Sequence, residues 1–241
     1  MDRLAVIADA HGNSWALSAV LEDIARRGLS HIVNLGDTAD ADMDPSGTVA
    51  LMMASGADSI AGNYETFRPG QLSPEQEAWL TGLPKTLDLG EIFCCHGTPV
   101  SDTDALIEEI TLDRVELAPV QTIAARLAGI AHPVILCAHK HMPRMVMLPS
   151  GQVLVNPGSV GLPAYWNDEP VLHTVEAGSP HARYAILTRT GAGWAVEHVA
   201  LPYPWDHAVA AARASGREDR AAFLATGRAL VPPELLAAAK R

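Results

Sequence analysis

The chain has 241 residues, with 17 Lys and Arg, 28 Asp and Glu and ten His, so its formal net charge is −11 with His neutral. This length permits one large domain or two small ones, and it buries a core without needing disulfides or structural metals. Hydrophobic content of 48% excludes a disordered chain, and the acidic balance argues against binding long nucleic acid, whose phosphates require clustered Lys and Arg.

Neither a membrane segment nor a secretory signal is indicated by the sequence. The first apolar run covers residues 4–8 and ends at Asp9, far short of a signal-peptide core. Elsewhere, too, apolar stretches stay well below the roughly 20 residues of a membrane span. Cys94, Cys95 and Cys137 lie within apolar runs, which is typical of reduced core thiols. We therefore expect a cytoplasmic protein with no membrane contact.

Short apolar runs alternate with amphipathic segments through the first part of the chain. Strands are predicted at residues 4–8, 31–35, 58–61, 91–95 and 134–137. Helices are predicted at residues 14–27 and 45–55, after Ser73, and twice within residues 102–128. Ser73 begins its helix as the N-cap, with Pro at the first position and Gln at the third.

Hairpins and an irregular segment follow in the second part. Residues 145–155 and 182–201 each carry two apolar runs around a turn, which predicts a hairpin in each. Residues 162–181 predict a long irregular loop, in which Trp166 stacks on a substrate base, closes a subunit contact or anchors the loop. We expect one α/β domain over residues 1–203. A helical extension over residues 204–241 packs on that domain or on a partner subunit and carries no chemistry.

Residues able to bind a metal ion follow nearly every predicted strand. Each of these residues alone would be an ordinary turn residue. Five such turns in succession, however, contain four His, and turns do not require His. Ligands of α/β sheets bind beyond the carboxyl ends of the strands, so we expect these turns to converge. The candidate ligands are Asp9, His11, Asp37, Asn63, His96, His139 and His141.

The number and type of these donors favour two ions over one. Seven side chains exceed the needs of a four-coordinate zinc ion, and imidazole is the wrong donor for calcium. Imidazole mixed with carboxylate and amide oxygen suits a pair of Mn, Fe, Zn, Co or Ni ions, and a carboxylate such as Asp37 could bridge them. Such a pair favours hydrolysis of phosphoesters by a bridging hydroxide.

The residues listed above, taken with their neighbours, resemble the calcineurin-like metallophosphoesterase family. The flanking stretches at residues 9–13, 96–99 and 156–161 resemble its bacterial branch of small phosphodiesterases and phosphatases. The resemblance covers about residues 3–200 and rests on five motifs in order: Asp9-Ala10-His11, Gly36-Asp37, Gly62-Asn63-Tyr64-Glu65, His96 and Ala138-His139-Lys140-His141. It implies a four-layer α-β-β-α sandwich with a C-terminal helical tail. It also assigns two ligand sets and one bridge: Asp9, His11 and His141; Asn63, His96 and His139; and Asp37 between the two ions.

Two positions depart from the family pattern. Ala138 replaces a Gly, which is a mild change. Tyr64 replaces the His that protonates the leaving group in many members, and a phenol, with a reference pKa of about 10, is poorly matched to that role at neutral pH. The alternative role for Tyr64 is packing beside the site. We expect Asn63 and His96 to position the phosphate.

The resulting hypothesis is a dinuclear metal-dependent phosphoesterase that prefers small phosphodiesters. Two alternatives stay open: a phosphomonoesterase acting on nucleotides, small molecules or phosphoproteins, and a non-catalytic metal-binding scaffold. Lys140, between two expected ligands, is predicted to point outward, and Ser159, Asn156 and Asn13 are expected to have structural roles around the site. Homo-oligomerisation also stays open.

Overall fold

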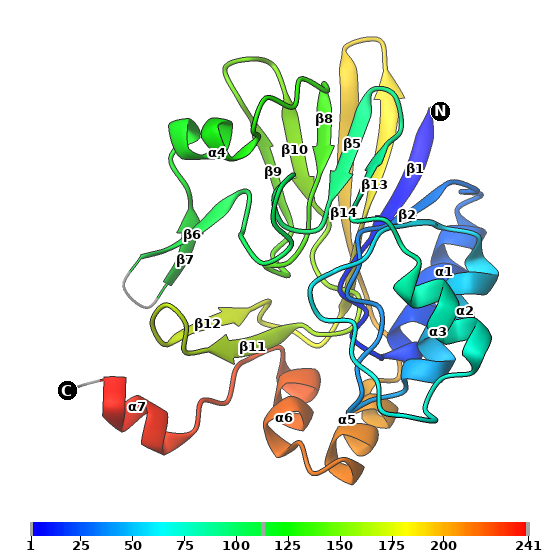
Figure 1. The fold of residues 1–241 in the computed structure, drawn as a ribbon, viewed down its shortest axis with the longest axis vertical. Coiled ribbons are helices and arrows are strands. Elements are labelled where there is room, and N and C mark those ends of the chain that lie inside the picture. Colours follow the sequence, from blue (N-terminus) through cyan, green and yellow to red (C-terminus); the bar gives the residue numbers. More distant parts are fainter. Residues whose placement is uncertain (1, 112–113, 240–241) are drawn as a thin grey trace.

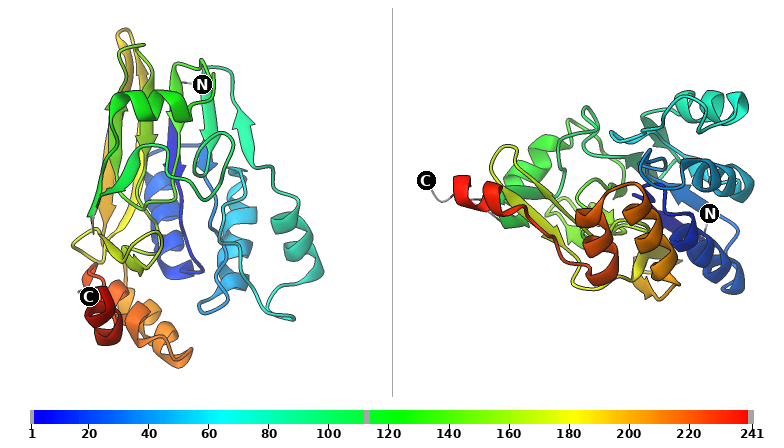
Figure 2. Two further views of the ribbon diagram at one scale, coloured as in Figure 1. Left: turned by 60° about the vertical axis from the view of Figure 1, so that its left-hand side comes forward. Right: turned by 90° about the horizontal axis from the view of Figure 1, so that it is seen from below.

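The computed structural model describes residues 2–111 and 114–239. Two five-stranded sheets face each other and helices cover their outer sides, as Figures 1 and 2 show. The first sheet has the order β14-β13-β1-β2-β3, with bounds β1 Arg3–Ile7, β2 Ile32–Asn34, β3 Asp58–Ser59, β13 Ala182–Thr190 and β14 Gly193–Leu201. The second has the order β4-β5-β8-β10-β9, with bounds β4 Thr86–Asp88, β5 Ile92–Cys95, β8 Val134–Leu136, β9 Arg144–Met147 and β10 Val153–Asn156.

Seven helices and two small hairpins complete the described part of the chain. The helices are α1 Ser14–Arg26, α2 Pro45–Ser55, α3 Pro74–Thr81, α4 Val120–Arg126, α5 Trp205–Ala214, α6 Glu218–Thr226 and α7 Pro233–Ala239. The hairpins are β6 Glu108–Thr111 with β7 Arg114–Leu117, and β11 Ala164–Asn167 with β12 His173–Glu176. The predicted N-cap of α3 is confirmed, since Ser73 and Gln76 form the capping box. Helix α1 is capped by Asn13, whose side chain accepts from the Ala16 amide. Within the described residues, none of the helices combines the length and apolarity that crossing a bilayer requires.

Side-chain alternation along the central strands explains the layers. In β1, Ala5 and Ile7 pack with α1 on the outer side, whereas Leu4 and Val6 face the second sheet. In β5, Cys94 faces the first sheet and Phe93 faces outward. Because both faces of these strands are covered, their sequences are continuously apolar rather than alternating. The predicted four-layer α-β-β-α sandwich is confirmed, and all three cysteines are buried free thiols as expected.

The outer layer on the second sheet differs from the prediction. Two helical stretches were predicted within residues 102–128, but only α4 is a helix, and the preceding segment forms the β6–β7 hairpin. Leu106 and Ile110 have helical spacing in sequence. In the structure, however, Leu106 is buried beneath the second sheet, while Ile110 pairs with Val115 across the hairpin. Local spacing does not distinguish a helix from a hairpin whose first residues are anchored by the core.

The segment 162–181 is also more regular than predicted, since β11 and β12 pair over four residues each. Its first strand packs on the C-terminal extension: Ala164 and Leu162 share a small apolar cluster with Phe223 of α6. Farther along this extension, α5 adds Ala208 and Ala212 to the core around α1. The extension therefore packs against the same core as the residues before it, at the lower end of the sheets in Figure 1.

Candidate functional site

The carboxyl ends of β1, β2, β3, β5 and β8 meet at one edge of the two facing sheets. The first three strands belong to one sheet and the last two to the other. The loops after these strands hold the predicted ligand residues, and contacts between their side chains cross from sheet to sheet. The predicted convergence of the five turns is therefore confirmed, with the added feature that it spans two sheets.

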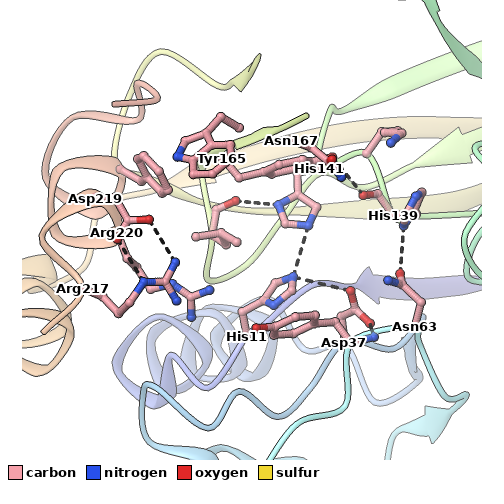
Figure 3. Close-up of a pocket in the computed structure, with 15 residues that line it drawn as sticks. His11, Asp37, Asn63, His139, His141, Tyr165, Asn167, Arg217, Asp219 and Arg220 are labelled. Atoms are coloured by element: carbon pink, nitrogen blue, oxygen red, sulfur yellow. Dashed lines mark hydrogen bonds and ion pairs between the residues drawn. The ribbon is translucent and has the colours of Figure 1, made fainter. Parts of the chain in front are cut away.

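Four buried side chains form one compact group of donors. One ligand atom from each of Asp9, His11, Asp37 and His141 lies within 4.8 Å of the others. The Nε2 atom of His11 is 3.2 Å from Nε2 of His141 and 3.5 Å from Oδ2 of Asp37. Oδ1 of Asp9 is 3.5 Å from Nε2 of His141. Figure 3 shows the imidazoles of His11 and His141 facing each other beside Asp37.

A second group adjoins the first through Asp37. Oδ1 of Asn63 lies 2.9 Å from Nε2 of His96 and 2.9 Å from Nδ1 of His139. Nε2 of His96 is also 3.4 Å from Oδ2 of Asp37, the same oxygen that faces His11. The other oxygen, Oδ1, accepts a hydrogen bond of 2.7 Å from the backbone N–H of Tyr64. Asp37 thus lies between the two groups.

Unusual backbone conformations present these side chains. Among the described non-glycine residues, only six have positive φ, and five of them are at this site: Asp9 (56°), His11 (45°), Asp37 (54°), His139 (69°) and His141 (54°). Asp and His tolerate this region better than most residues, but it still carries a strain of order 1–3 kcal/mol each. Such strain persists only where surrounding structure imposes it, which is typical of functional sites.

Two glycines make the close approach of these loops possible. A Cβ atom on Gly62 would lie 2.0 Å from Oδ1 of Asp37, and one on Gly36 would lie 2.4 Å from the backbone nitrogen of Gly62. The loops after β2 and β3 therefore pack backbone against backbone. Glu65 stabilises the contact between these two loops. Its carboxylate accepts hydrogen bonds from the backbone N–H groups of Thr38, at 3.0 Å, and Gly62, at 3.3 Å.

The charges of the site are not balanced by hydrogen bonds. Both carboxylate oxygens of Asp9 are buried and have no hydrogen-bond partner among the described residues, and burial raises the pKa of this group to about 7 against the opposing effect of His96. Burial also acts to raise the pKa of Asp37, but His96 and His11 outweigh it and lower that pKa. A buried carboxylate without partners is costly unless a cation compensates it. Imidazole and carboxylate donors fit a borderline divalent metal ion.

The orientation of two imidazoles is set by backbone carbonyls. Nδ1 of His96 lies 2.7 Å from the carbonyl of Leu35, and Nδ1 of His141 lies 2.7 Å from the carbonyl of Leu162. A carbonyl can only accept, so each Nδ1 carries a proton. In the neutral ring this leaves Nε2 with a free lone pair directed into the site, as a metal ligand requires.

Polar residues behind the loops take the structural roles predicted for them. Ser159 donates from Oγ to the Asp9 carbonyl at 2.8 Å, and Asn156 donates from Nδ2 to the Ala138 carbonyl at 2.9 Å. Asn13, besides capping α1, donates to the carbonyl of Gly161 at 3.0 Å. These bonds hold the loops that carry Asp9 and His139 in place.

A cavity of about 300 Å³ opens over this site, and part of its wall comes from residues for which no chemistry was predicted. From the site itself it is lined by His11, Asp37, Asn63, Tyr64, His139 and His141. Its other side includes Tyr165, Trp166, Arg217, Asp219, Arg220 and Phe223. Figure 3 shows the side chains of α6 across the cavity from His139 and Asn63. The extension, for which no chemistry was predicted, therefore supplies part of the cavity wall, including the buried Arg220.

The structure also places three residues that the sequence singled out. Lys140 is only 8% exposed and lines the cavity, so the prediction that it points outward is wrong; burial lowers the pKa of its ammonium group. Tyr64 lies beside the site with its ring centroid 5.5 Å from that of His11. Trp166 packs on the cluster around Phe223, as an anchor of its segment would, and it also lines the cavity.

Comparisons with known proteins agree with this arrangement. A family model described as "Calcineurin-like phosphoesterase superfamily domain" matches residues 3–178. The fold is similar to a metallophosphoesterase from Sphaerobacter thermophilus (TM-score 0.70, 22% identity, 94% of this chain and 99% of that one). It is similar to a hypothetical protein from Pyrococcus horikoshii (TM-score 0.68, 20% identity, 94% and 99%). Over 62 residues, 26% of each chain, it is 40% identical to an uncharacterized protein of Methanocaldococcus jannaschii.

Proposed function

Because this chain belongs to the calcineurin-like phosphoesterase superfamily and is a metal-dependent phosphoesterase, we propose that it works with two divalent ions and prefers small phosphodiesters. The observation that carries the dinuclear proposal is Asp37. One of its oxygens lies 3.5 Å from Nε2 of His11 and 3.4 Å from Nε2 of His96, between the two donor groups. A carboxylate in this position is suited to bridging a pair of ions.

The residues of each group fit a divalent ion. Asp9, His11 and His141 would hold the first, and the unpartnered oxygens of Asp9 are the observation that supports it. Asn63, His96 and His139 would hold the second, through an amide oxygen and two imidazoles already in contact. Ions from the series Mn, Fe, Zn, Co and Ni supply Lewis-acid charge for phosphoryl oxygens and make water a nucleophile at neutral pH.

The protein's own groups then determine which esters are accepted. The Oδ1 atom of Asn63 is turned to the two imidazoles, so its Nδ2 can donate to a phosphoryl oxygen. Tyr64 lines the cavity at the place where a stronger proton donor would serve alkyl leaving groups, which favours esters with acidic leaving groups. The wall formed by Trp166 and Phe223 offers apolar surface for the second ester arm of a diester.

The test combines metal analysis with a pair of substrates. We expect the protein to bind two equivalents of Mn²⁺ and to hydrolyse bis(p-nitrophenyl) phosphate faster than p-nitrophenyl phosphate. Asp37→Asn removes a bridging charge and should lose at least one ion and about a hundredfold in kcat/KM. Asp58→Asn, at an exposed Asp on β3, is the matched control and should behave as the unmodified protein.

Each other result rejects a definite part of the proposal. Undiminished hydrolysis by Asp37→Asn would reject the bridging role. Faster hydrolysis of the monoester would favour the alternative of a phosphomonoesterase. Two bound ions with neither substrate hydrolysed would favour the non-catalytic scaffold.

A further inference from the structure

A buried ion pair joins the C-terminal extension to the loop that follows β2. Arg220 on α6 is 6% exposed, and its guanidinium Nη1 donates to Oδ2 of Asp40, which is fully buried. Nearby, Arg217 donates to Asp42 at 2.7 Å and makes two bonds of 3.0 Å to Asp219. These two contacts connect the start of α6 to the segment just after Asp37. Figure 3 shows Arg217, Asp219 and Arg220 together at the side of the cavity.

Asp40 in turn faces the one imidazole of the first donor group that lacks a backbone partner. His141 has the Leu162 carbonyl at 2.7 Å from its Nδ1. Nδ1 of His11 is buried with no hydrogen-bond partner among the described residues, and Oδ2 of Asp40 is 3.8 Å away from it. The same Asp40 oxygen thus lies against Arg220 on one side and His11 on the other.

The charge of Arg220 keeps this arrangement intact. The Asp40 carboxylate is fully buried, and its Oδ2 accepts a hydrogen bond from the guanidinium of Arg220. Without Arg220 a buried carboxylate would be left without its main compensating cation, which is strongly unfavourable. Asp40 would then turn away from this buried position, and the orientation of His11 would no longer be fixed.

We propose that Arg220 is a positioning residue for the first metal site: acting through Asp40, it holds the His11 imidazole with Nε2 directed to Asp9, Asp37 and His141. The affinity of that site for a divalent ion is then coupled to the docking of α6. Linkage makes the coupling reciprocal, so a bound ion also stabilises α6 against local opening. This inference rests on the proposed metal site but not on any catalytic step.

The experiment measures metal affinity in the full-length protein. Mn²⁺ binding is followed by calorimetry for Arg220→Met, Arg220→Lys and Asp40→Asn, with Arg213→Ala, an exposed residue of α5 paired to Glu218, as the control. We expect Arg220→Met and Asp40→Asn each to lower the affinity for one of the two Mn²⁺ ions by about 10–100-fold, the range for groups that orient metal ligands. Arg220→Lys keeps the charge and should retain most of the affinity, and Arg213→Ala should change nothing.

Hydrogen exchange over residues 218–226 provides the second readout. Mn²⁺ should slow exchange in α6 of the unmodified protein but not of Arg220→Met. If Arg220→Met binds both ions with unchanged affinity and loses only thermal stability, the pair is purely structural and the proposal is overturned. If Arg220→Met does not fold, the double variant Arg220→Met/Asp40→Asn removes both buried charges. This variant must still bind one of the two Mn²⁺ ions with lowered affinity.

The same measurements separate this inference from the proposed function. If the unmodified protein binds two ions but hydrolyses neither substrate, the proposed function would be rejected. The effect of Arg220→Met on Mn²⁺ affinity would still test the present inference. If the unmodified protein hydrolyses the substrates but Arg220→Met binds Mn²⁺ with the same affinity, only the role proposed for Arg220 would be rejected. Failure of the unmodified protein to bind Mn²⁺ would overturn both.

Discussion

Asp37 and Tyr64 illustrate how closely neighbouring residues are coupled at the site. The backbone N–H of Tyr64 orients one oxygen of Asp37, while the Tyr64 ring lies against His11 and lines the cavity. Gly62, two residues earlier, has no room for a side chain beside the same carboxylate. The backbone of Gly62-Asn63-Tyr64 therefore contacts Asp37, while the side chains of Asn63 and Tyr64 line the cavity.

Exchanging the Tyr64 phenol for an imidazole should widen the range of leaving groups. Tyr64→His places a group with a reference pKa near 6.5 where proton donation is required, and general acid catalysis contributes about 10²–10⁴-fold when well placed. We expect turnover of alkyl phosphomonoesters to rise by at least tenfold, measured by phosphate release. Tyr64→Phe is the control and should leave p-nitrophenyl esters unaffected, since their leaving group needs no proton. Unchanged or lower alkyl monoester turnover in Tyr64→His would contradict this role for residue 64.

At the level of elements, α1 is tied to the first sheet by a buried polar contact. Asp23 of α1 accepts from the Tyr184 hydroxyl of β13 at 2.5 Å and from Nε of Arg27 at 2.7 Å. Burial acts to raise the pKa of Asp23, but these two contacts outweigh it, so the pKa in the folded protein lies below its ordinary value of 3.8. The bond between helix and strand therefore stabilises the fold through the charged carboxylate.

The sign of this shift predicts a pH-dependent loss of stability. A lowered pKa stabilises the fold above the unfolded value near 3.8, and the contribution disappears as the pH falls below it. Asp23→Asn should reduce the free energy of unfolding by about 1–2 kcal/mol at pH 7, measured by urea denaturation. The difference from the unmodified protein should shrink as the pH is lowered through the range below 3.8. A constant difference across this range would contradict the argument.

Which elements could be predicted depended on how local their causes are. Helices α1 and α3 were predicted because their caps and stop signals lie within the element. The β6–β7 and β11–β12 hairpins were missed because their strands are stabilised by distant partners: the second sheet beneath Leu106, and α6 beside Ala164. Hydrophobic spacing reports that a face is buried but does not report what buries it.

For the whole molecule, the two sheets bring strained and uncompensated groups together at their loop ends. Five backbone positions of positive φ and the unpartnered oxygens of Asp9 gather where the sheets meet. The fold holds these groups together in spite of their strain and mutual repulsion. We therefore expect metal binding to contribute directly to global stability.

Removal of metal should lower the melting temperature reversibly. An ion at a hundredfold excess over its Kd stabilises by about 2.7 kcal/mol, which for a chain of this size corresponds to roughly 5–10 °C. Calorimetry of the Mn²⁺-loaded protein before and after treatment with a chelator measures the shift, and added Mn²⁺ should restore it. Asp37→Asn serves as the comparison and should show a smaller shift. Identical melting temperatures in all states would contradict a role for metal in stability.

The sequence by itself determined the family, the core strands and the residues that converge, because these depend on residue type, order and the period of apolar side chains. Tertiary structure decided what surrounds these residues. It buries Lys140, places the β11–β12 hairpin in the wall of the cavity and pairs Arg220 with Asp40. These contacts join segments up to 180 residues apart, so no local pattern encodes them. The pair of Arg220 and Asp40, in particular, forms only when the C-terminal extension folds back onto the core beside the loop after β2.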